Sequence, residues 1–221
     1  LAGPRAPRGV VLDLRGNRGG LLRQAVTSVA LLMDEGLVAT TAGRDQAASH
    51  AWRVQGGDLA HGLPVVVLVD GRTASAAEVM AAALADGRRA VVVGSATLGK
   101  GLVQTITPLP DGGELFVTWS RILAPLGWPL QGLGVMPQVC TSAGEDATQR
   151  QLRSLALGVQ EAQATLVAAR QARAPLTPAR VLALRAACPA MEGSDSDLEA
   201  ARFLVAHPQA YRTGLLDMPP S

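Results

Sequence analysis

The single lysine of this 221-residue chain is the side chain best suited to acid–base chemistry. Nineteen of the 20 basic residues are arginine, and only Lys100 carries an amine. Arginine stays protonated in proteins, whereas a desolvated lysine amine can lose its proton and act as a base. No Asp or Glu stands between Val91 and Pro110 to hold the amine in its charged form. Composition alone leaves two interpretations open, a catalytic base or an ordinary surface lysine.

A strand–helix–strand pattern precedes Lys100 and places a serine near it. Residues 63–70 and 89–94 are short apolar runs typical of buried strands, and residues 74–85 form an alanine-rich helical segment that begins around Ser75. In a right-handed βαβ unit the two strands are parallel, so the loops after them lie at the same edge of the sheet. We therefore expect Ser75 and Lys100 to lie close together in space.

A serine beside a neutral amine is a nucleophile with its base. The amine can accept the hydroxyl proton as the oxygen attacks a carbonyl, and free N–H groups at the helix start, such as that of Ala76, can bind the resulting oxyanion. Most serines at helix starts are ordinary N-caps, however. Spacing alone leaves both interpretations of Ser75 open.

A third apolar run points to the same edge. Residues 9–14 read as a buried strand, which is followed by a turn containing Gly19 and Gly20 and then by a helical pattern over 21–35. Consecutive glycines after a parallel strand let backbone amides approach a ligand closely. One of the two glycines is a candidate second oxyanion donor, and an ordinary strand-to-helix turn is the alternative.

Three segments together resemble the carboxyl-terminal processing proteases, also called tail-specific serine peptidases. They are DLRGNRGGLL at 13–22, VVLVDGRTASAAEV at 66–79 and VGSATLGKGLVQ at 93–104. The resemblance covers roughly residues 9–138, and the order and spacing of the segments make it more specific than any one of them. Arg18 stands where the family commonly has proline, and Gln138 where an aspartate is usual.

The resemblance implies a role for each candidate site residue. Ser75 corresponds to the nucleophile, Lys100 to the general base, and Gln104 to a glutamine that orients the lysine. The backbone amides of Ala76 and of one residue in the Gly19–Gly20 pair correspond to the oxyanion hole. The implied activity is that of a serine endopeptidase, which cleaves protein substrates near their C-termini through an acyl-enzyme and uses no cofactor.

The resemblance also implies an α/β fold, with a crotonase-like (ClpP/crotonase) β/α spiral as the protease core over residues 1–140. Nothing in the chain resembles the PDZ domain of the family, so we expect that domain in the N-terminal part of a longer parent protein. A periplasmic or cell-envelope location is implied by the family alone, because no signal segment or membrane span is visible.

Residues 141–221 read as a helical C-terminal appendage. An apolar stripe over 147–174 predicts a helix, Thr177-Pro178 begins a second, and residues 196–199 form a capping box for a third. Such helices can pack on the core or join two copies of the chain in a homo-oligomer. Cys140 and Cys188 are too few for a zinc site, and we expect either buried thiols or a disulfide between core and tail.

Two other functions compete with the peptidase. GSATLGK at 94–100 matches the start of a phosphate-binding P-loop, but Gly101 replaces the metal-binding Ser or Thr, and the following residues predict a hairpin rather than a helix. A non-catalytic peptide-binding scaffold on the same fold is the second alternative. Nucleic-acid binding is disfavoured, because aromatics make up 3% of the chain and the arginines are dispersed.

Overall fold

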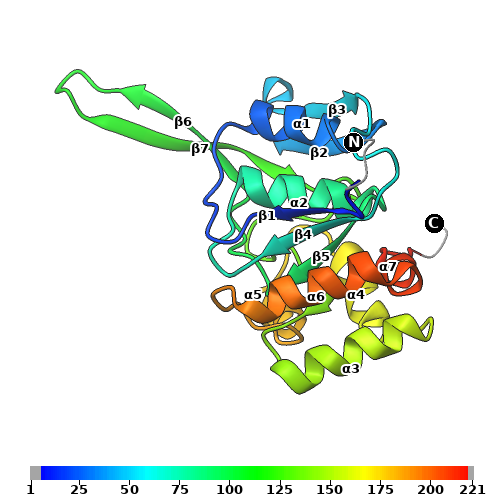
Figure 1. Cartoon of the computed structure of the whole chain (residues 1–221). Coiled ribbons are helices and arrows are strands. Elements are labelled where there is room, and N and C mark those ends of the chain that lie inside the picture. The colour runs from blue at the N-terminus through cyan, green and yellow to red at the C-terminus, as the bar shows by residue number, and fades with distance from the viewer. Residues whose placement is uncertain (1–5, 219–221) are drawn as a thin grey trace.

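The computed structural model describes residues 6–218, which form two four-stranded β-sheets and the helices that cover them (Figure 1). The first sheet is parallel, in the order β1-β4-β5-β8. Its strands are Val10–Asp13, Val65–Val69, Ala90–Gly94 and Val139–Cys140. Every residue of β4 and β5 is buried, which explains their continuous apolar sequences. The predicted parallel strand–helix–strand unit is confirmed.

The second sheet is antiparallel, in the order β3-β2-β7-β6. Its strands in chain order are β2 (Glu35–Gly43), β3 (His50–Gln55), β6 (Leu102–Pro108) and β7 (Glu114–Leu123), and the short helix η1 (Gln46–Ala48) joins the first two. The predicted hairpin after Lys100 is confirmed as β6 and β7. Its tip projects away from the rest of the molecule (Figure 1).

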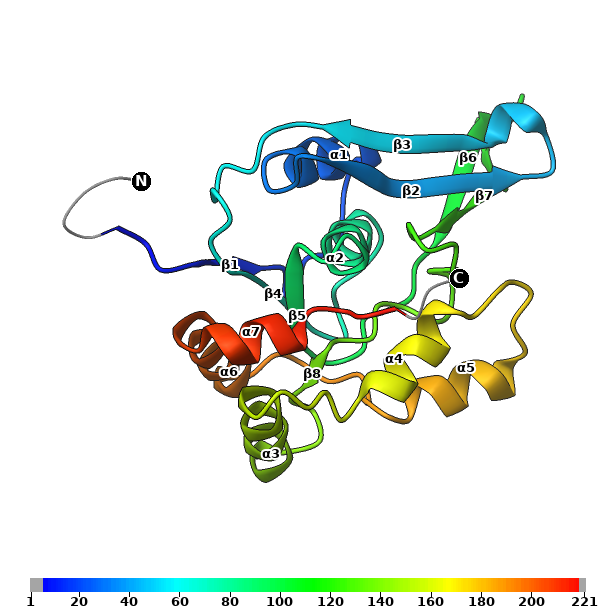
Figure 2. The same cartoon turned by 90° about the vertical axis from the view of Figure 1, so that its right-hand side faces the viewer.

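Helix α2 (Ala76–Asp86) lies between the two sheets, and helix α1 (Leu22–Ala30) packs against α2, β2 and β3 (Figure 2). Helix α2 contacts β2 of one sheet and β5 of the other. A helix covered on both sides must be apolar around most of its circumference, and its alanines let both sheets approach closely. The main core cluster accordingly joins Leu84 of α2 to Val67, Val92 and Val38 of the strands.

Five helices follow Cys140 in the described part of the chain, namely α3 (Glu145–Ala156), α4 (Gln163–Arg170), α5 (Pro178–Arg185), α6 (Asp195–Ala206) and α7 (Pro208–Gly214). Residues of α3, α6 and α7 pack on the outward side chains of β4 and β5 and so cover the other face of the parallel sheet (Figure 2). Ala168 of α4 and Leu184 of α5 pack instead with the main core cluster. A disulfide joins Cys140 to Cys188. Within residues 6–218, no helix is long and apolar enough to cross a membrane.

Two expectations about these helices are wrong. The predicted helix over 147–174 is two helices, because α3 ends before Gly158, whose φ of +86° is the left-handed geometry that closes a helix. The third helix begins two residues earlier than expected, with Ser194 as its N-cap and Asp197 accepting the Ser194 N–H. Arg15 contacts the same Asp197 carboxylate from the core, which favours this capping register over the neighbouring one.

Candidate active site

Ser75 precedes α2 in a strained backbone conformation. Its φ of 57° and ψ of −122° lie in a region that residues other than glycine rarely adopt. An ordinary N-cap residue has extended backbone angles, so this serine is not a typical cap. Backbone strain that the surrounding structure maintains occurs most often at functional sites. The geometry therefore favours a functional serine over the capping interpretation.

The buried carboxylate of Glu78 joins two segments at the edge of the parallel sheet. They are the serine turn (residues 70–75, between β4 and α2) and the lysine loop (residues 95–101, between β5 and β6). The Oε2 atom of Glu78 accepts the Ser75 N–H and the Lys100 N–H, each at 2.8 Å, and its Oε1 atom accepts the Gly99 N–H at 2.7 Å. The Thr97 hydroxyl also donates to Oε1. Glu78 is 0% exposed, so water does not compete for these hydrogen bonds.

Glu78 is not among the site residues predicted from the sequence, although the sequence carries a signal for it. Ser75 and Glu78 have the Ser-x-x-Glu spacing of a capping box, in which the glutamate accepts the N–H of the cap residue. That half of the motif is formed here. The absence of acidic residues near Lys100 in sequence was misleading, because the fold brings the Glu78 carboxylate to its backbone.

The two loops also meet directly. The Leu98 N–H donates to the Thr73 carbonyl oxygen at 3.0 Å. Gly99 and Gly101 pack so tightly on the chain after β7 that an added Cβ would lie 2.9 Å and 2.4 Å from its backbone atoms. Lys100 stands between them, and its side chain is exposed.

Gln104 lies on β6, opposite Thr118 of β7, and is exposed. The residues after Lys100 are therefore a strand of an antiparallel sheet. A P-loop requires a helix at this point to bind phosphate at its N-terminus. The structure contradicts the P-loop alternative for this reason.

Gly19 is pressed against the serine turn. Its φ is +90°, and a Cβ at this position would lie 2.6 Å from the Ala74 oxygen and 2.8 Å from the Ala76 nitrogen. Only glycine combines that backbone angle with so close an approach. The glycine turn predicted from the sequence thus lies directly beside the start of α2.

Asn17 fixes this glycine turn and distinguishes the two candidate glycines. Its main-chain oxygen accepts the Ala74 N–H, and its side-chain oxygen accepts the Gly19 N–H, each at 2.9 Å. Among the residues that the structure describes, the N–H groups of Ala76 and Gly20 have no acceptor. These two amides are therefore free to bind an anionic oxygen.

Asp70 fixes the turns after β1 and β4 at the same edge of the parallel sheet. It is 1% exposed, and its Oδ1 atom accepts the N–H groups of Gly16, Arg72 and Thr73 at 2.9–3.0 Å. The Gly193 N–H lies 3.4 Å from Oδ2. Burial alone would raise the pKa of Asp70, but the hydrogen bonds from Gly16, Arg72, Thr73 and Gly193 favour the charged carboxylate and hold the pKa below its ordinary value.

Taken together, the edge of the parallel sheet holds a strained serine, a lysine loop bound to it and two free amides, that of Ala76 at the start of α2 and that of Gly20 in the glycine turn. This set can support nucleophilic attack on a carbonyl group with stabilisation of the oxyanion. Among residues 6–218, no group of three or more His, Cys, Asp or Glu is placed to hold a metal ion.

Comparison with known proteins identifies the family. The sequence profile of Peptidase family S41 matches residues 3–141. The chain is 42% identical over 132 residues to a carboxy-terminal-processing protease of Bartonella bacilliformis. This match covers 60% of the chain and 30% of the relative. It is 40% identical over 131 residues to a chloroplastic C-terminal processing peptidase of Tetradesmus obliquus, covering 59% of this chain and 28% of the relative.

A solved structure shares this architecture. The photosystem II D1 C-terminal processing protease superposes with a TM-score of 0.53 at 39% sequence identity, covering 59% of this chain and 33% of that one. The chain spans about three-tenths of the length of the curated relatives that it matches. On the family match over more than half of its residues, the chain belongs to peptidase family S41.

Proposed function

We propose that the chain forms the catalytic part of a serine endopeptidase, which hydrolyses protein substrates near their C-termini through an acyl-enzyme. The observation that carries this proposal is the Glu78 carboxylate, which accepts the N–H groups of both Ser75 and Lys100 and so holds their two loops together. The names of the relatives support the same activity, since they are C-terminal processing proteases.

In the proposed reaction, Ser75 Oγ attacks the scissile carbonyl carbon while Lys100 Nζ accepts the hydroxyl proton. The tetrahedral intermediate then collapses, the carbon–nitrogen bond breaks, and Nζ returns the proton to the leaving amine. A water molecule hydrolyses the acyl-enzyme by the same route. Gln104 orients the lysine. Because the Lys100 side chain is exposed, the bound substrate must exclude water from the amine.

The oxyanion is bound by two backbone amides. Ala76 supplies one at the start of α2, where the helix dipole also favours negative charge. The second comes from the Gly19–Gly20 pair, and Gly20 is the better donor because the Gly19 N–H already donates to Asn17. Both amides lie on backbone that Asn17 and Glu78 hold in place, so little reorganisation is needed when charge develops.

We extend the proposal to the whole protein from the family resemblance of its sequence. The core to residue 140 is a crotonase-like β/α spiral, and residues 141–221 are a helical appendage whose helices α3, α6 and α7 cover the second face of its sheet. A PDZ domain, a periplasmic or envelope location, and self-association through the C-terminal helices are further parts of this proposal. The match to bacterial and chloroplast processing proteases supports the location.

A serine-directed fluorophosphonate tests the nucleophile. The full-length protein should be labelled on Ser75 in peptide mapping, and Ser75→Ala should not be labelled. Ser28→Ala, in α1, serves as a matched control and should react like the parent. Absence of label in the folded parent would contradict the peptidase and favour a non-catalytic peptide-binding scaffold.

A further inference from the structure

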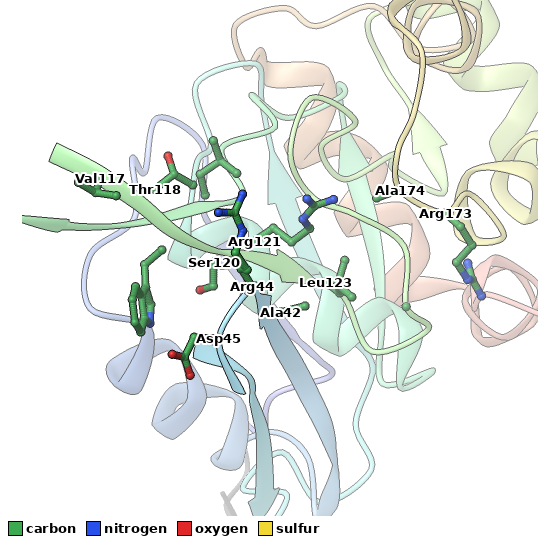
Figure 3. Close-up of a pocket in the computed structure, with 14 residues that line it drawn as sticks. Ala42, Arg44, Asp45, Val117, Thr118, Ser120, Arg121, Leu123, Arg173 and Ala174 are labelled. Atoms are coloured by element: carbon green, nitrogen blue, oxygen red, sulfur yellow. The ribbon is translucent and has the colours of Figure 1, made fainter. Parts of the chain in front are cut away.

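A groove of about 1,030 Å³ lies on the antiparallel sheet, beside the lysine loop (Figure 3). Its walls come from β7, from the turn after β2 and from the segment after α4. Ser75 and Lys100 do not line it, but Leu102 does. Leu102 pairs with Arg121, and the Ile122 N–H donates to the Gly101 oxygen at 2.7 Å. The groove thus begins where the lysine loop enters β6.

The groove is basic. Three arginines line it, Arg44, Arg121 and Arg173, against the single carboxylate of Asp45. Figure 3 shows Arg44 and Arg121 near its centre and Arg173 toward one end. The Asp45 carboxylate accepts the Ala47 N–H at 2.8 Å, which gives it a structural role at the start of η1.

Arg44 and Arg121 have free guanidinium groups. Both side chains are exposed, and within the described part of the chain neither forms an ion pair or a side-chain hydrogen bond. Arg173 instead donates to the main-chain oxygens of Arg170 and Ala172. The planar guanidinium group pairs with carboxylates through two parallel hydrogen bonds, so the two free arginines are suited to a carboxylate ligand.

Apolar side chains stand beside these charges. Trp119 and Leu102 line the groove and remain 42% and 39% exposed. An indole next to guanidinium groups provides a surface on which an apolar side chain of a peptide can pack. An inorganic anion would leave this surface uncovered, and a free amino acid would bring its α-ammonium group into a groove lined by three arginines. A peptide uses both the charge and the apolar contact without that added positive charge.

We propose that the groove binds a carboxylate-bearing segment of the substrate peptide, with Arg44 and Arg121 pairing with the carboxylate and Trp119 covering a neighbouring apolar side chain. This inference rests on the proposed peptidase function and adds a substrate preference to it. The carboxylate has two sources with the same chemistry, an Asp or Glu side chain and the free C-terminus of the substrate.

Binding of fluorescent decapeptides to the full-length Ser75→Ala variant tests the proposal without hydrolysis. One neutral, apolar sequence is made as its C-terminal amide, as its C-terminal acid, and as an amide with one internal Asp. We expect at least one carboxylate peptide to bind about 10-fold more tightly than the neutral amide, since a charged hydrogen bond contributes that much or more. The two acidic peptides distinguish a terminal from an internal carboxylate.

Arginine variants locate the preference. Arg121→Gln and Arg44→Gln, each combined with Ser75→Ala, should bind the acidic and neutral peptides about equally. Arg53→Gln is the matched control, because Arg53 is an exposed arginine of β3 in the same sheet and does not line the groove. The Arg53→Gln variant should keep the ratio of affinities for acidic and neutral peptides that the Ser75→Ala protein shows. High salt should weaken the preference, as expected for exposed charges.

Two outcomes would overturn the proposal. In the first, the Ser75→Ala protein binds the acidic and neutral peptides equally or binds none of them. In the second, the Arg44→Gln and Arg121→Gln variants both keep its full preference for the acidic peptides. Either result leaves the fluorophosphonate labelling of Ser75 unaffected. Conversely, an unlabelled Ser75 together with a groove-dependent preference would retain the binding site and reject the peptidase.

Discussion

Helix α2 carries a buried carboxylate near each end, and the two carboxylates have different kinds of partner. Glu78, in the first turn, accepts backbone N–H groups and one hydroxyl, and has no ion pair among the described residues. Asp86, in the last turn, pairs with Arg170 at 2.9 Å and accepts the Trp128 indole N–H at 2.8 Å. One end of α2 therefore organises the site, and the other fixes a C-terminal helix to the core.

The helix dipole explains the difference. Its positive end lies at the start of α2, and there the N–H groups of Ser75, Gly99 and Lys100 bind the Glu78 carboxylate without a cation. Its negative end lies beside Asp86, and complete burial raises the pKa of that carboxyl, against the attraction of Arg170. A buried charge at that end needs a cation, and Arg170 supplies it while also lying over the Trp128 ring at 4.6 Å.

Removing Asp86 should have the largest effect on stability. Asp86→Ala leaves the fully buried Arg170 without its partner, which typically costs about 3–5 kcal/mol. Urea unfolding measures the loss, and Asp146→Ala, an exposed residue of α3, is the control. An Asp86→Leu/Arg170→Met double variant should recover most of it. A loss below about 1 kcal/mol for Asp86→Ala would show that the pair does not hold α4 to the core.

The disulfide is the second tie between the core and the C-terminal helices. Cys140 and Cys188 are 48 residues apart, and a cross-link of this length contributes about 2–4 kcal/mol, mainly by restricting the unfolded chain. A thiol reductant should lower the urea midpoint by a corresponding amount. The Cys140→Ser/Cys188→Ser variant should be insensitive to the reductant. Equal midpoints with and without reductant in the parent protein would contradict this contribution.

Changing Glu78 should affect activity more than folding. Glu78→Gln keeps the size of the side chain but replaces one acceptor oxygen with an NH₂ group that cannot accept the N–H groups now bound there. We expect kcat to fall about 100-fold, equivalent to about 2.7 kcal/mol, with a smaller change in KM. Glu35→Gln, an exposed residue of β2, is the control. An unchanged kcat in Glu78→Gln would show that the Glu78 carboxylate is not needed to position Ser75 and Lys100.

The pH dependence of Asp70 is expected to be the smallest effect. Because its pKa is lowered in the folded state, the charged carboxylate contributes stability above its unfolded pKa of about 3.9, and this contribution is lost as pH falls through the lower, folded value. Asp70→Asn should flatten that part of the stability curve below about pH 4. Urea unfolding at several pH values gives the free energy of unfolding as a function of pH. Identical slopes of this curve in parent and variant would contradict the assigned hydrogen bonds.

Local patterns predicted much of this molecule. The valine runs of β4 and β5, the hairpin after Lys100 and the serine at the start of α2 each follow from periodicity or turn composition within a few residues. Gly158 also marked the end of α3 in the sequence, although the apolar stripe obscured it.

The parts that could not be predicted depend on contacts between distant residues. The hydrogen bond between Glu78 and Lys100 joins residues that are 22 positions apart in the sequence. The hydrogen bonds that Asp70 accepts from Gly16 and Gly193 span 54 and 123 positions. The choice of Ser194 over Ser196 as an N-cap accompanies a contact to Arg15 on the core. Alternating Ser and Asp residues all make good caps, so local sequence alone does not determine which one begins the helix.

The proposed reaction depends on a lysine amine at position 100 that activates Ser75. We would measure hydrolysis of an unfolded protein substrate by the full-length protein and by its Lys100→Arg variant, after checking that both are folded to the same extent. We expect cleavage by the parent and essentially none by the variant, since arginine keeps the positive charge but cannot accept the proton. Equal cleavage by the two proteins would show that Lys100 is not the base that activates Ser75.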